Sequence, residues 1–422
     1  MRPLFNYMLL KNSSFGLPIC SNLLMNYKRT ASFAILPFQS KTKLSSNSID
    51  TLKWNSANIY TRTAPIAPVA STGTEVAKDE SKEFMDVFPD IVRDLTSAGR
   101  HPDIPDANNW YAKVLEYTVP GGKKNRGLTV VTAYRVFCPP AELTPANIRL
   151  AHVLGWCVEM LQAFLLILDD IIDGAEMRRG YPCWYQLHEN KNIAINDGVL
   201  VENGIYVILK KYFRDKPYYL DILEACQDAI FKTSMGQLSE ILMCRTFQET
   251  RKFDTFTIDR YNTITKYKTS YYSFHLPVAL SMYMAGINDP EVHRQVKYIL
   301  LEMGHYYQIQ DDYLDCFGDA DEIGKLGFND IKEGKCSWPI VVALQRATAQ
   351  QKQTLEKCYQ SADPENMQTV KKIHQEIGLP SIFATYEEQV HKSIVDHIQQ
   401  LPRGIPEEIF FKMLDKIHAR SI

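Results

Sequence analysis

The sequence predicts an all-α protein, a large single-domain helical bundle with a central active-site cavity. Three observations support this prediction. From about Ser81 onward, apolar residues recur with a spacing close to the 3.6-residue period of a helix. Clusters of Pro and Gly divide this region into segments of helix length. Alternating apolar and polar runs with hairpin turns, which would indicate strands, are nearly absent. Ligand sites in helical bundles form between facing helices, so we expect the site in the core.

The first predicted helix covers residues 81–99 and places Phe84, Val87 and Phe88 on one face. Pro89 lies inside it and is expected to kink or end a turn. The other predicted helices follow in chain order at 107–118, 125–137, 145–173, 196–213, 217–245, 257–285, 290–317, 337–347, 350–360, 365–377, 380–401 and 405–418. Turn signals separate them at Pro120 to Gly122, Pro139 and Pro140, Gly286 to Pro290, and Gly318 to Gly334.

The composition is that of an ordinary globular protein. The 422 residues are 45% hydrophobic and 23% charged, with a net charge of −2. A large core can therefore form, and nothing indicates a nucleic-acid partner. The nine Cys are scattered without a Cys-x-x-Cys spacing, which favours free thiols in a reducing compartment over a disulfide framework or a zinc site. We expect no transmembrane segment, because no apolar stretch approaches the roughly 18 residues that one needs.

Residues 1–49 differ from the rest because they carry Lys, Arg and many Ser but no Asp or Glu. This composition is typical of an organellar transit peptide, and we expect a mitochondrial matrix address. The alternative is a leader without an address on a cytoplasmic protein. Residues 50–80 are rich in Thr, Ala, Pro and Ser, which indicates a linker. Residues 81–422 then form the all-α domain.

Two copies of the motif Asp-Asp-x-x-Asp are the most informative feature of the sequence. The first consists of Asp169, Asp170 and Asp173, and the second of Asp311, Asp312 and Asp315. Positions i and i+4 share a helix face, where two like charges repel by roughly 4 kcal/mol at an effective dielectric of about 20. One such motif would fit a solvated helix end, but two inside apolar helices predict bound cations. We expect Mg²⁺, because it prefers oxygen ligands and shares its coordination shell with substrate phosphates.

The helix at 145–173 supplies a wall beneath the first motif. At about 100° per residue, Gln162, Leu165, Asp169 and Asp173 lie within about one quarter of the helix circumference. Residues 163–168 are apolar and would line the depth below the carboxylates. This spacing suggests a diphosphate held by metals at the rim, with an apolar tail along the wall. Most of these side chains must also pack as ordinary core.

Cationic residues flank both motifs. In chain order they are Lys123 and Arg126 in GGKKNRG, Arg178 and Arg179 after the first motif, Lys268 before Thr269, and Lys325 and Lys335 after the second motif. Arg offers a planar fork for bidentate phosphate contacts, and Lys a point charge. Each alone would more often be a solvated surface residue. Together with two predicted metal clusters, they indicate a phosphate-binding site.

These segments resemble the short-chain trans-isoprenyl diphosphate synthases, and among them the animal farnesyl diphosphate synthases. The matching stretches run in order from about residue 81 to residue 418: GGKKNRGLTVV, LQAFLLILDDIIDGAEMRRGYPCWYQ, KYKTSYYSFHLP, YYQIQDDYLD and GKCSWPIV. The resemblance implies the all-α isoprenoid synthase fold, three Mg²⁺ ions per site and a homodimer. It also implies condensation of isopentenyl diphosphate with dimethylallyl diphosphate and then geranyl diphosphate, giving farnesyl diphosphate.

The resemblance further implies a role for each site residue. The principal Mg²⁺ ligands would be Asp169, Asp173 and Asp311, supported by Asp170, Asp312 and Asp315. The allylic diphosphate would be bound by Arg178, Lys268 and Lys325, with Lys335 nearby. Isopentenyl diphosphate would be bound by Lys123, Arg126, Gln162 and Arg179. The developing allylic cation would face Thr269, Gln308 and the backbone carbonyl of Lys268.

Three features depart from the family pattern. Animal farnesyl synthases usually carry two aromatic residues five and four positions before the first Asp, where this chain has Phe164 and Leu165. These positions set chain length, because bulk below the metals stops the growing tail, so the product is expected to be C10 or C15. The loop GKLGFNDIKEGK is one residue longer than usual. The terminus DKIHARSI lacks the usual strongly basic tail, which would weaken closure over isopentenyl diphosphate.

Two other functions fit the same fold. A terpene synthase derived from it would ionise a prenyl diphosphate alone and would be expected to lose the isopentenyl pocket. All four residues of that pocket are present: Lys123, Arg126, Gln162 and Arg179. A non-catalytic subunit of a heteromeric synthase would show broken acidic motifs, whereas both motifs are intact. The pattern therefore favours a prenyltransferase, with a geranyl diphosphate synthase that stops at C10 as its variant.

Overall fold

The computed structural model describes residues 73–97, 102–318, 328–402 and 404–419, with side chains from residue 80. All of these residues belong to one compact unit, Ala70–Ile422. The expected leader at 1–49, most of the expected linker at 50–80, and Lys325 lie outside the described residues.

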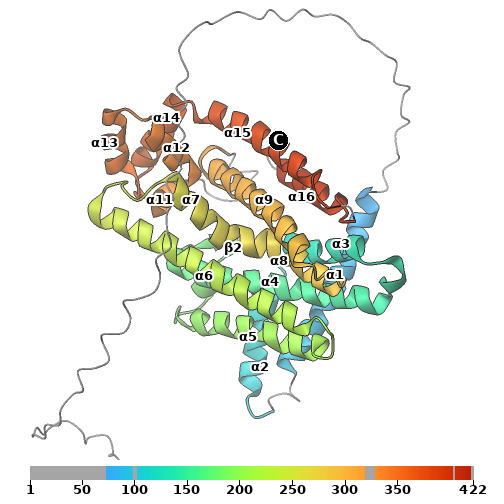
Figure 1. Ribbon diagram of the computed structural model, residues 1–422. Helices are drawn as coiled ribbons and strands as arrows, with labels where there is room; N and C mark the ends of the chain where they lie inside the picture. Colours follow the sequence, from blue (N-terminus) through green and yellow to red (C-terminus); the bar gives the residue numbers. More distant parts are fainter. Residues whose placement is uncertain (1–72, 98–101, 319–327, 403, 420–422) are drawn as a thin grey trace, which may run out of the picture. The chain divides into compact units, whose positions relative to one another are not determined.

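The described part of the chain is almost wholly helical (Figure 1), which confirms the predicted all-α class. In chain order the helices are α1 (Gly73–Thr96), α2 (Pro105–Thr118), α3 (Asn125–Phe137), η1 (Pro140–Glu142), α4 (Pro145–Asp173), η2 (Trp184–Leu187), α5 (Ile193–Phe213), α6 (Tyr219–Thr250), α7 (Ile258–Thr265), η3 (Lys266–His275), α8 (Leu276–Met284), α9 (Pro290–Phe317), α11 (Asn329–Glu333), α12 (Trp338–Arg346), α13 (Ala349–Cys358), α14 (Pro364–Glu376), α15 (Leu379–Ile398) and α16 (Glu408–His418). A short antiparallel pair, β1 (Met177–Arg178) and β2 (Tyr181–Pro182), follows α4.

Helices α4 and α9 begin and end at the predicted residues. At the start of α4, Thr144 Oγ1 accepts a hydrogen bond from the N–H of Asn147 at 3.2 Å. At the start of α9, Asp289 Oδ1 accepts one from the N–H of Glu291 at 2.8 Å. Each cap is followed by a Pro in the first helical turn, where its missing N–H costs nothing. Gly174 follows the last residue of α4, and its φ of 63° is the left-handed conformation that closes a helix.

Other elements differ from the prediction. Helix α1 begins at Gly73 and continues through Pro89, so the end of the expected linker is helical. The segment predicted as one helix at 257–285 consists of α7, η3 and α8, and η3 is a π-helix. The region expected to be a turn before Gly334 contains the short helix α11.

Helix α4 lies within the core, where all of its residues from 151 to 164 are buried. It packs against α3 and α5. At the contact with α3 the backbones touch, because a Cβ on Gly127 would lie 2.9 Å from the carbonyl oxygen of Gly155. The expectation that no segment is long and apolar enough to cross a membrane is wrong for α4, by length and composition alone. However, 83% of its most apolar window is buried inside the fold, so this surface serves core packing.

One buried and two half-buried histidines are expected to make the fold sensitive to acid. Burial lowers the pKa of His374 to about 4, of His305 to about 4 and of His275 to about 3. In the unfolded chain each histidine binds a proton near pH 6.5. The unfolded state therefore takes up more protons below that pH, and stability is lost as the pH falls from about 6.5 towards 4. Each group contributes up to about 1.4 kcal/mol per pH unit in this window.

Denaturant unfolding between pH 7 and pH 4.5 measures this loss directly. The variant His374→Gln is expected to lose less stability over this pH range than the wild type. The difference should equal the contribution of the one proton that His374 takes up on unfolding. Equal pH slopes for the variant and the wild type would contradict the prediction.

Candidate active site

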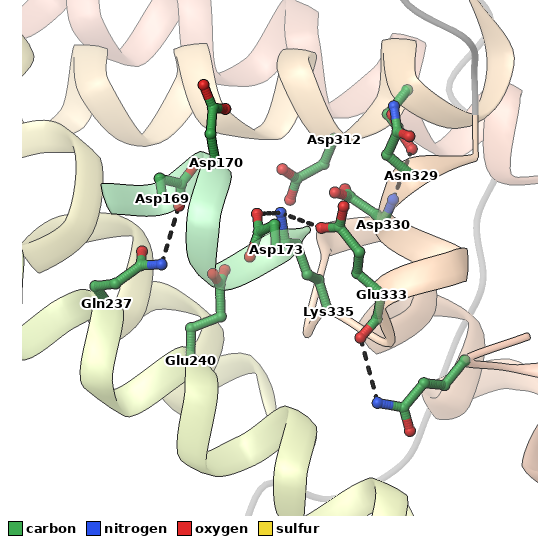
Figure 2. Close-up of polar contacts among 12 residues, drawn as sticks. Asp169, Asp170, Asp173, Gln237, Glu240, Asp312, Asn329, Asp330, Glu333 and Lys335 are labelled. Atoms are coloured by element: carbon green, nitrogen blue, oxygen red, sulfur yellow. Dashed lines mark hydrogen bonds and ion pairs between the residues drawn. The ribbon is translucent and has the colours of Figure 1, made fainter. Parts of the chain in front are cut away.

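The two acidic motifs occupy the last turns of α4 and α9, and one segment contacts both of them. Lys335 Nζ donates to Asp173 Oδ2 at 2.9 Å. Three residues further on, the backbone N–H of Trp338 donates to Asp312 Oδ2 at 2.9 Å. Figure 2 shows Asp173, Asp312 and Lys335 gathered together, although the motifs are far apart in the chain. The fold therefore brings the two motifs to one segment of the chain, as joint binding of cations would require.

Both motifs lie at C-terminal helix ends, where the helix macrodipole is negative. A carboxylate in this position is unfavourable until a cation neutralises it. Helix α4 ends at Asp173 itself, and α9 ends two residues after Asp315. The motifs therefore lie where positive charge is favourable, and protein side chains supply part of it to Asp169, Asp170 and Asp173.

Asp169 contacts polar side chains from three different segments of the chain. Its Oδ1 accepts a hydrogen bond from Gln237 Nε2 at 2.9 Å and lies 3.6 Å from Lys268 Nζ. Its Oδ2 lies 3.3 Å from the guanidinium of Arg178. Burial raises the pKa of Asp169, but the charges of Lys268, Lys335 and Arg178 outweigh burial and hold the pKa below its usual range. The side chain is therefore ionised at neutral pH.

Asp170 is turned towards the protein instead. Its side chain is only 5% exposed, and its Oδ1 accepts two hydrogen bonds from Arg178, that from Nε at 2.8 Å. Burial raises the pKa of Asp170, and Arg178 opposes that rise. On a helix Asp170 lies about 100° from Asp169, and Figure 2 shows it pointing away from Asp173. In this structure Asp170 holds Arg178, one of the residues expected to bind the allylic diphosphate.

A chain of hydrogen bonds links η3 to the second motif. Thr269 Oγ1 donates to Gln308 Oε1 at 2.7 Å, and Gln308 Nε2 donates to Asp312 Oδ1 at 2.7 Å. The hydroxyl of Tyr261 donates to Asp312 Oδ2 at 2.8 Å. Burial raises the pKa of Asp312 to about 7, against these hydrogen bonds.

This chain fixes the direction of the Thr269 hydroxyl. The NH₂ group of Gln308 faces a carboxylate, so its oxygen faces Thr269 and takes that proton. The lone pairs of Thr269 Oγ1 are then available to a positive centre. The two oxygens of Asp312 accept hydrogen bonds from Tyr261, Gln308 and the N–H of Trp338, which fixes the carboxylate against which Gln308 is oriented.

Asp315 caps the short helix α11. Its Oδ2 accepts from the N–H of Asp330 at 3.0 Å, and its Oδ1 from the amide of Asn329 at 3.4 Å. The same helix carries Glu333, whose carboxylate lies 2.5 Å from Lys335 Nζ. Asp315 of the second motif therefore holds α11 in place. Lys335, two residues after this helix, contacts Asp173 of the first motif (Figure 2). Lys325, expected to act beside Lys335, lies outside the described residues.

Helix α6 forms a wall of the site that the sequence motifs do not indicate. Gln237 donates to Asp169, and Glu240 forms an ion pair with Lys268. Figure 2 shows both side chains extending from α6 towards the first motif. Burial lowers the pKa of Lys268, but Glu240 and Asp169 outweigh it, so the ammonium group stays charged. The sequence signal for this wall is the i, i+3 spacing of Gln237 and Glu240 beside Gly236, a spacing that is common on helix surfaces.

A second cationic region forms around the glycine turn that precedes α3. The guanidinium of Arg126 donates to Ser273 Oγ at 2.8 and 3.0 Å and to Tyr272 Oη at 3.2 Å. The guanidinium of Arg179 lies on the turn, since a Cβ on Gly122 would be 2.7 Å from Arg179 Cζ. Arg126 and Arg179, both expected to bind isopentenyl diphosphate, thus lie in one region although they belong to different segments of the chain.

Gln162 and Lys123 are the other residues expected in this region. Lys123 is exposed at the turn. Gln162 is 8% exposed, and its amide oxygen has no hydrogen-bond partner among the described residues. Amide oxygen and nitrogen exchange places by rotation, so this buried group can donate to a phosphate. One turn earlier, Glu159 accepts from the N–H of Gly127 at 2.7 Å and anchors the start of α3.

The hairpin that carries Arg178 and Arg179 is anchored by Asp197 of α5, a carboxylate that is 0% exposed. Its Oδ1 accepts from Trp110 Nε1 at 3.0 Å, and its Oδ2 from Trp184 Nε1 at 2.8 Å. Trp184 belongs to η2, which follows the hairpin directly. The two indole groups therefore tie the hairpin to α2 and α5.

We expect Asp197→Asn to destabilise the fold and to weaken diphosphate binding. The amide would present NH₂ to one indole N–H, leaving a buried donor unsatisfied at a cost of about 1–3 kcal/mol. Denaturant unfolding should show this loss, and the KM values for both diphosphate substrates should rise as the arginines move. The surface variant Asp215→Asn is the control and should match the wild type. Unchanged stability and KM in Asp197→Asn would contradict the anchoring role.

The expected chain-length residues lie beneath Asp169 on α4. Phe164 is buried, and Leu165 is half-buried and packs against the main core cluster. Leu165 precedes Asp169 by four residues, so the two share a helix face.

The residues fit Mg²⁺ that is bound jointly with a substrate. Among the described residues no three His, Cys, Asp or Glu side chains are grouped closely enough to hold an ion by themselves. Asp169 and Asp173 offer only carboxylate oxygens, which Mg²⁺ prefers. Protein-bound Mg²⁺ commonly takes one or two carboxylates and completes its shell with phosphates and water. A pair of carboxylates such as Asp169 and Asp173 is therefore sufficient for Mg²⁺ binding when a diphosphate supplies the other oxygens.

Comparison with known proteins defines the class. Residues 108–377 match the polyprenyl synthetase family, and the chain belongs to this family. The farnesyl pyrophosphate synthase of Nezara viridula is 47% identical over 389 residues, covering 92% of this chain and 93% of that protein. The farnesyl pyrophosphate synthase of Gallus gallus is 44% identical, over 82% of this chain and 94% of that protein.

Solved structures agree with this assignment. A T. brucei farnesyl diphosphate synthase complexed with bisphosphonate has a TM-score of 0.75 and 30% identity, covering 81% of this chain and 99% of that chain. The resemblance seen in the sequence is therefore confirmed, as are the isoprenoid synthase fold and the prenyltransferase class.

Proposed function

We propose that this prenyltransferase condenses isopentenyl diphosphate with dimethylallyl diphosphate, and then with geranyl diphosphate, to give farnesyl diphosphate. The observation that carries the proposal is the presence of two separate cationic regions. One, with Lys268, Lys335 and Arg178, contacts the acidic motifs. The other contains Arg126 and Arg179. A condensation of two diphosphates needs both regions, whereas a terpene synthase needs only one.

The first cationic region receives the allylic diphosphate. Lys268, Lys335 and Arg178 stabilise negative charge as the C–O bond breaks and its electron pair stays on the diphosphate oxygen. Mg²⁺ held by Asp169, Asp173 and Asp311 supplies further neutralisation of the leaving group when bound. The lone pairs of Thr269 Oγ1 and the carbonyl of Lys268 stabilise the allylic cation. Names of curated relatives support a C15 product.

The second cationic region holds isopentenyl diphosphate with its double bond close to the allylic carbon. The π electrons of that bond form the new C–C bond, and the cation that results loses a proton to the released diphosphate. A new double bond replaces the one consumed, so no dedicated protein base is needed. Water must be excluded, because it would trap the cation as an alcohol.

The test is a product assay with the full chain, Mg²⁺, labelled isopentenyl diphosphate and dimethylallyl diphosphate. We expect labelled farnesyl diphosphate as the main product, with geranyl diphosphate as an intermediate, separated by chromatography. Labelled product that stops at C10 would identify a geranyl diphosphate synthase. Consumption of the allylic substrate without incorporation of label would favour a terpene synthase and overturn the proposal.

We further propose three Mg²⁺ ions per site, as the family resemblance implies. Removal of divalent ions with a chelator should abolish activity, and Mg²⁺ should restore it. Activity that persists after complete chelation would overturn this assignment.

A homodimer is also proposed, and an apolar stripe on α6 supports it. Phe231, Met235, Leu238 and Leu242 recur at helical spacing and are exposed. Exposed apolar surface of this kind is typical of a protein interface. Analytical ultracentrifugation should show a dimer, and Phe231→Glu should weaken it. A wild-type monomer at micromolar concentration would overturn the proposal.

For the leader we propose a mitochondrial address, supported by the acid-free, basic and Ser-rich composition of residues 1–49. A fluorescent protein fused after residue 49 should enter mitochondria. Diffuse cytoplasmic fluorescence would overturn this proposal.

A further inference from the structure

Helices α6 and α9 both pack against η3, the π-helix that carries Lys268 and Thr269. Each helix meets η3 through a glycine. A Cβ on Gly236 of α6 would lie 2.8 Å from the Cα of Lys268. A Cβ on Gly304 of α9 would lie 2.6 Å from Ser270 Cβ and 2.7 Å from Ser270 Cα. These separations are too short for any side chain, so the backbone of residues 268–270 is held directly between two helices.

The position of this backbone matters for the proposed chemistry. Thr269 lies between the two contacted residues, and its hydroxyl belongs to the hydrogen-bond chain through Gln308. A π-helix replaces i+4 hydrogen bonds by i+5 bonds and is often found at functional sites. Here the π-helix lies where Gly236 approaches Lys268 and Gly304 approaches Ser270, two residues further along.

The two glycines also connect η3 to the acidic motifs. Gln237, the residue after Gly236, donates to Asp169. Gly304 lies one helical turn before Gln308, which donates to Asp312. A displacement of η3 away from either glycine therefore also changes the distance between η3 and the carboxylates of Asp169 and Asp312.

We propose that Gly236 and Gly304 are positioning residues of prenyl transfer, which act by setting the place of the Lys268–Ser270 backbone against the two acidic motifs. This inference rests on the proposed function, because it concerns the same reaction. Neither glycine touches the substrate; each acts through the residues of η3. Their substitution should lower the rate of the chemical step more than it weakens substrate binding.

The first test is the kinetics of Gly236→Ala and Gly304→Ala in the full chain. An added methyl group must move η3 backbone, and misplacement by about 1 Å can cost about 100-fold in rate. We therefore expect kcat to fall by about 10- to 100-fold, with changes in KM that are much smaller. A wild type that forms no prenyl diphosphate would refute the proposed function; an active wild type with unaffected variants would refute only this inference.

Gly204→Ala is the matched control for general destabilisation. Gly204 lies on α5, and its added Cβ would be 2.3 Å from Tyr111 Oη, 2.9 Å from Met160 Cε and 3.3 Å from Leu95 Cδ1. This variant should lose thermal stability while keeping kcat within about 3-fold at temperatures where it is folded, because the methyl meets core side chains and not the backbone of η3. If all three variants lose kcat only in proportion to their unfolded fraction, the positioning role is overturned.

A rescue experiment separates the two contacts. The closest atoms to a Cβ on Gly304 include the side chain of Ser270, whereas those around Gly236 are backbone atoms. Ser270→Gly should therefore restore part of the kcat lost in Gly304→Ala and none of that lost in Gly236→Ala. The double variant Gly304→Ala with Ser270→Gly removes the side-chain part of the clash and leaves the contact with the Cα of residue 270. It therefore still tests the positioning role if Gly236→Ala fails to fold. Equal rescue of both variants, or of neither, would overturn the proposed geometry.

Discussion

Asp169→Asn is expected to lower kcat for prenyl transfer by about 1,000-fold or more. The substitution removes the negative charge that would bind Mg²⁺ and that pairs with Lys268 and Arg178. Asp169 is the carboxylate that Gln237, Lys268 and Arg178 all contact. Asparagine keeps the shape of the side chain but cannot neutralise Mg²⁺. Steady-state kinetics with both diphosphates, repeated over a range of Mg²⁺ concentrations, measures the loss.

The fold should survive this substitution. Without Asp169, Lys268 keeps its ion pair with Glu240, and Arg178 keeps its contacts with Asp170. Circular dichroism should therefore show wild-type helix content. The control is Asp228→Asn, which removes the exposed carboxylate from an ion pair with Lys232 on α6 and should leave kcat unchanged. Substantial activity in Asp169→Asn, or equal losses in both variants, would contradict the metal-binding role.

The ends of α4 and α9 can be predicted because the signals that set them are local. Thr144 and Asp289 each cap a helix start with their own side chains, and Gly174 closes α4 in a left-handed conformation. The acidic motifs lie on these helices, so their helical faces follow from the spacing as well. Asp311 and Asp315 share a face, whereas Asp312 lies about 100° away and points inward.

The partners of these carboxylates could not be predicted, because they depend on how helices approach each other. Nothing in the sequence pairs Asp312 with Tyr261, or Asp169 with Gln237, since each pair is joined only by the fold. The same holds for the π-helix at 266–275, whose residues form an unremarkable helical pattern. Helix α11 was missed because it has only five residues and lies in a stretch rich in turn signals.

Leu165→Phe is expected to shift the product from C15 towards C10, raising the ratio of geranyl to farnesyl diphosphate by about 10-fold or more. Leu165 lies one helical turn beneath Asp169 and on the same face, where the tail of a metal-bound allylic substrate must pass. It is half-buried, so a larger ring there takes space from the tail. Removing room for part of an isoprene unit costs about 1–3 kcal/mol of binding, which is enough to stop the second condensation. Chromatography of labelled products at equal turnover measures the ratio.

Leu166→Phe provides the matched control, because it makes the same change at the next position of the same helix. Leu166 lies one turn beneath Asp170, which faces Arg178 rather than Asp173. This variant should keep the wild-type product ratio even if the added ring lowers stability. Leu165→Ala should act in the opposite direction, because the smaller side chain leaves more space beneath Asp169 and allows products longer than C15. If Leu166→Phe changes the ratio as much as Leu165→Phe, the tail does not follow the face of Asp169, and chain length is set elsewhere in the bundle.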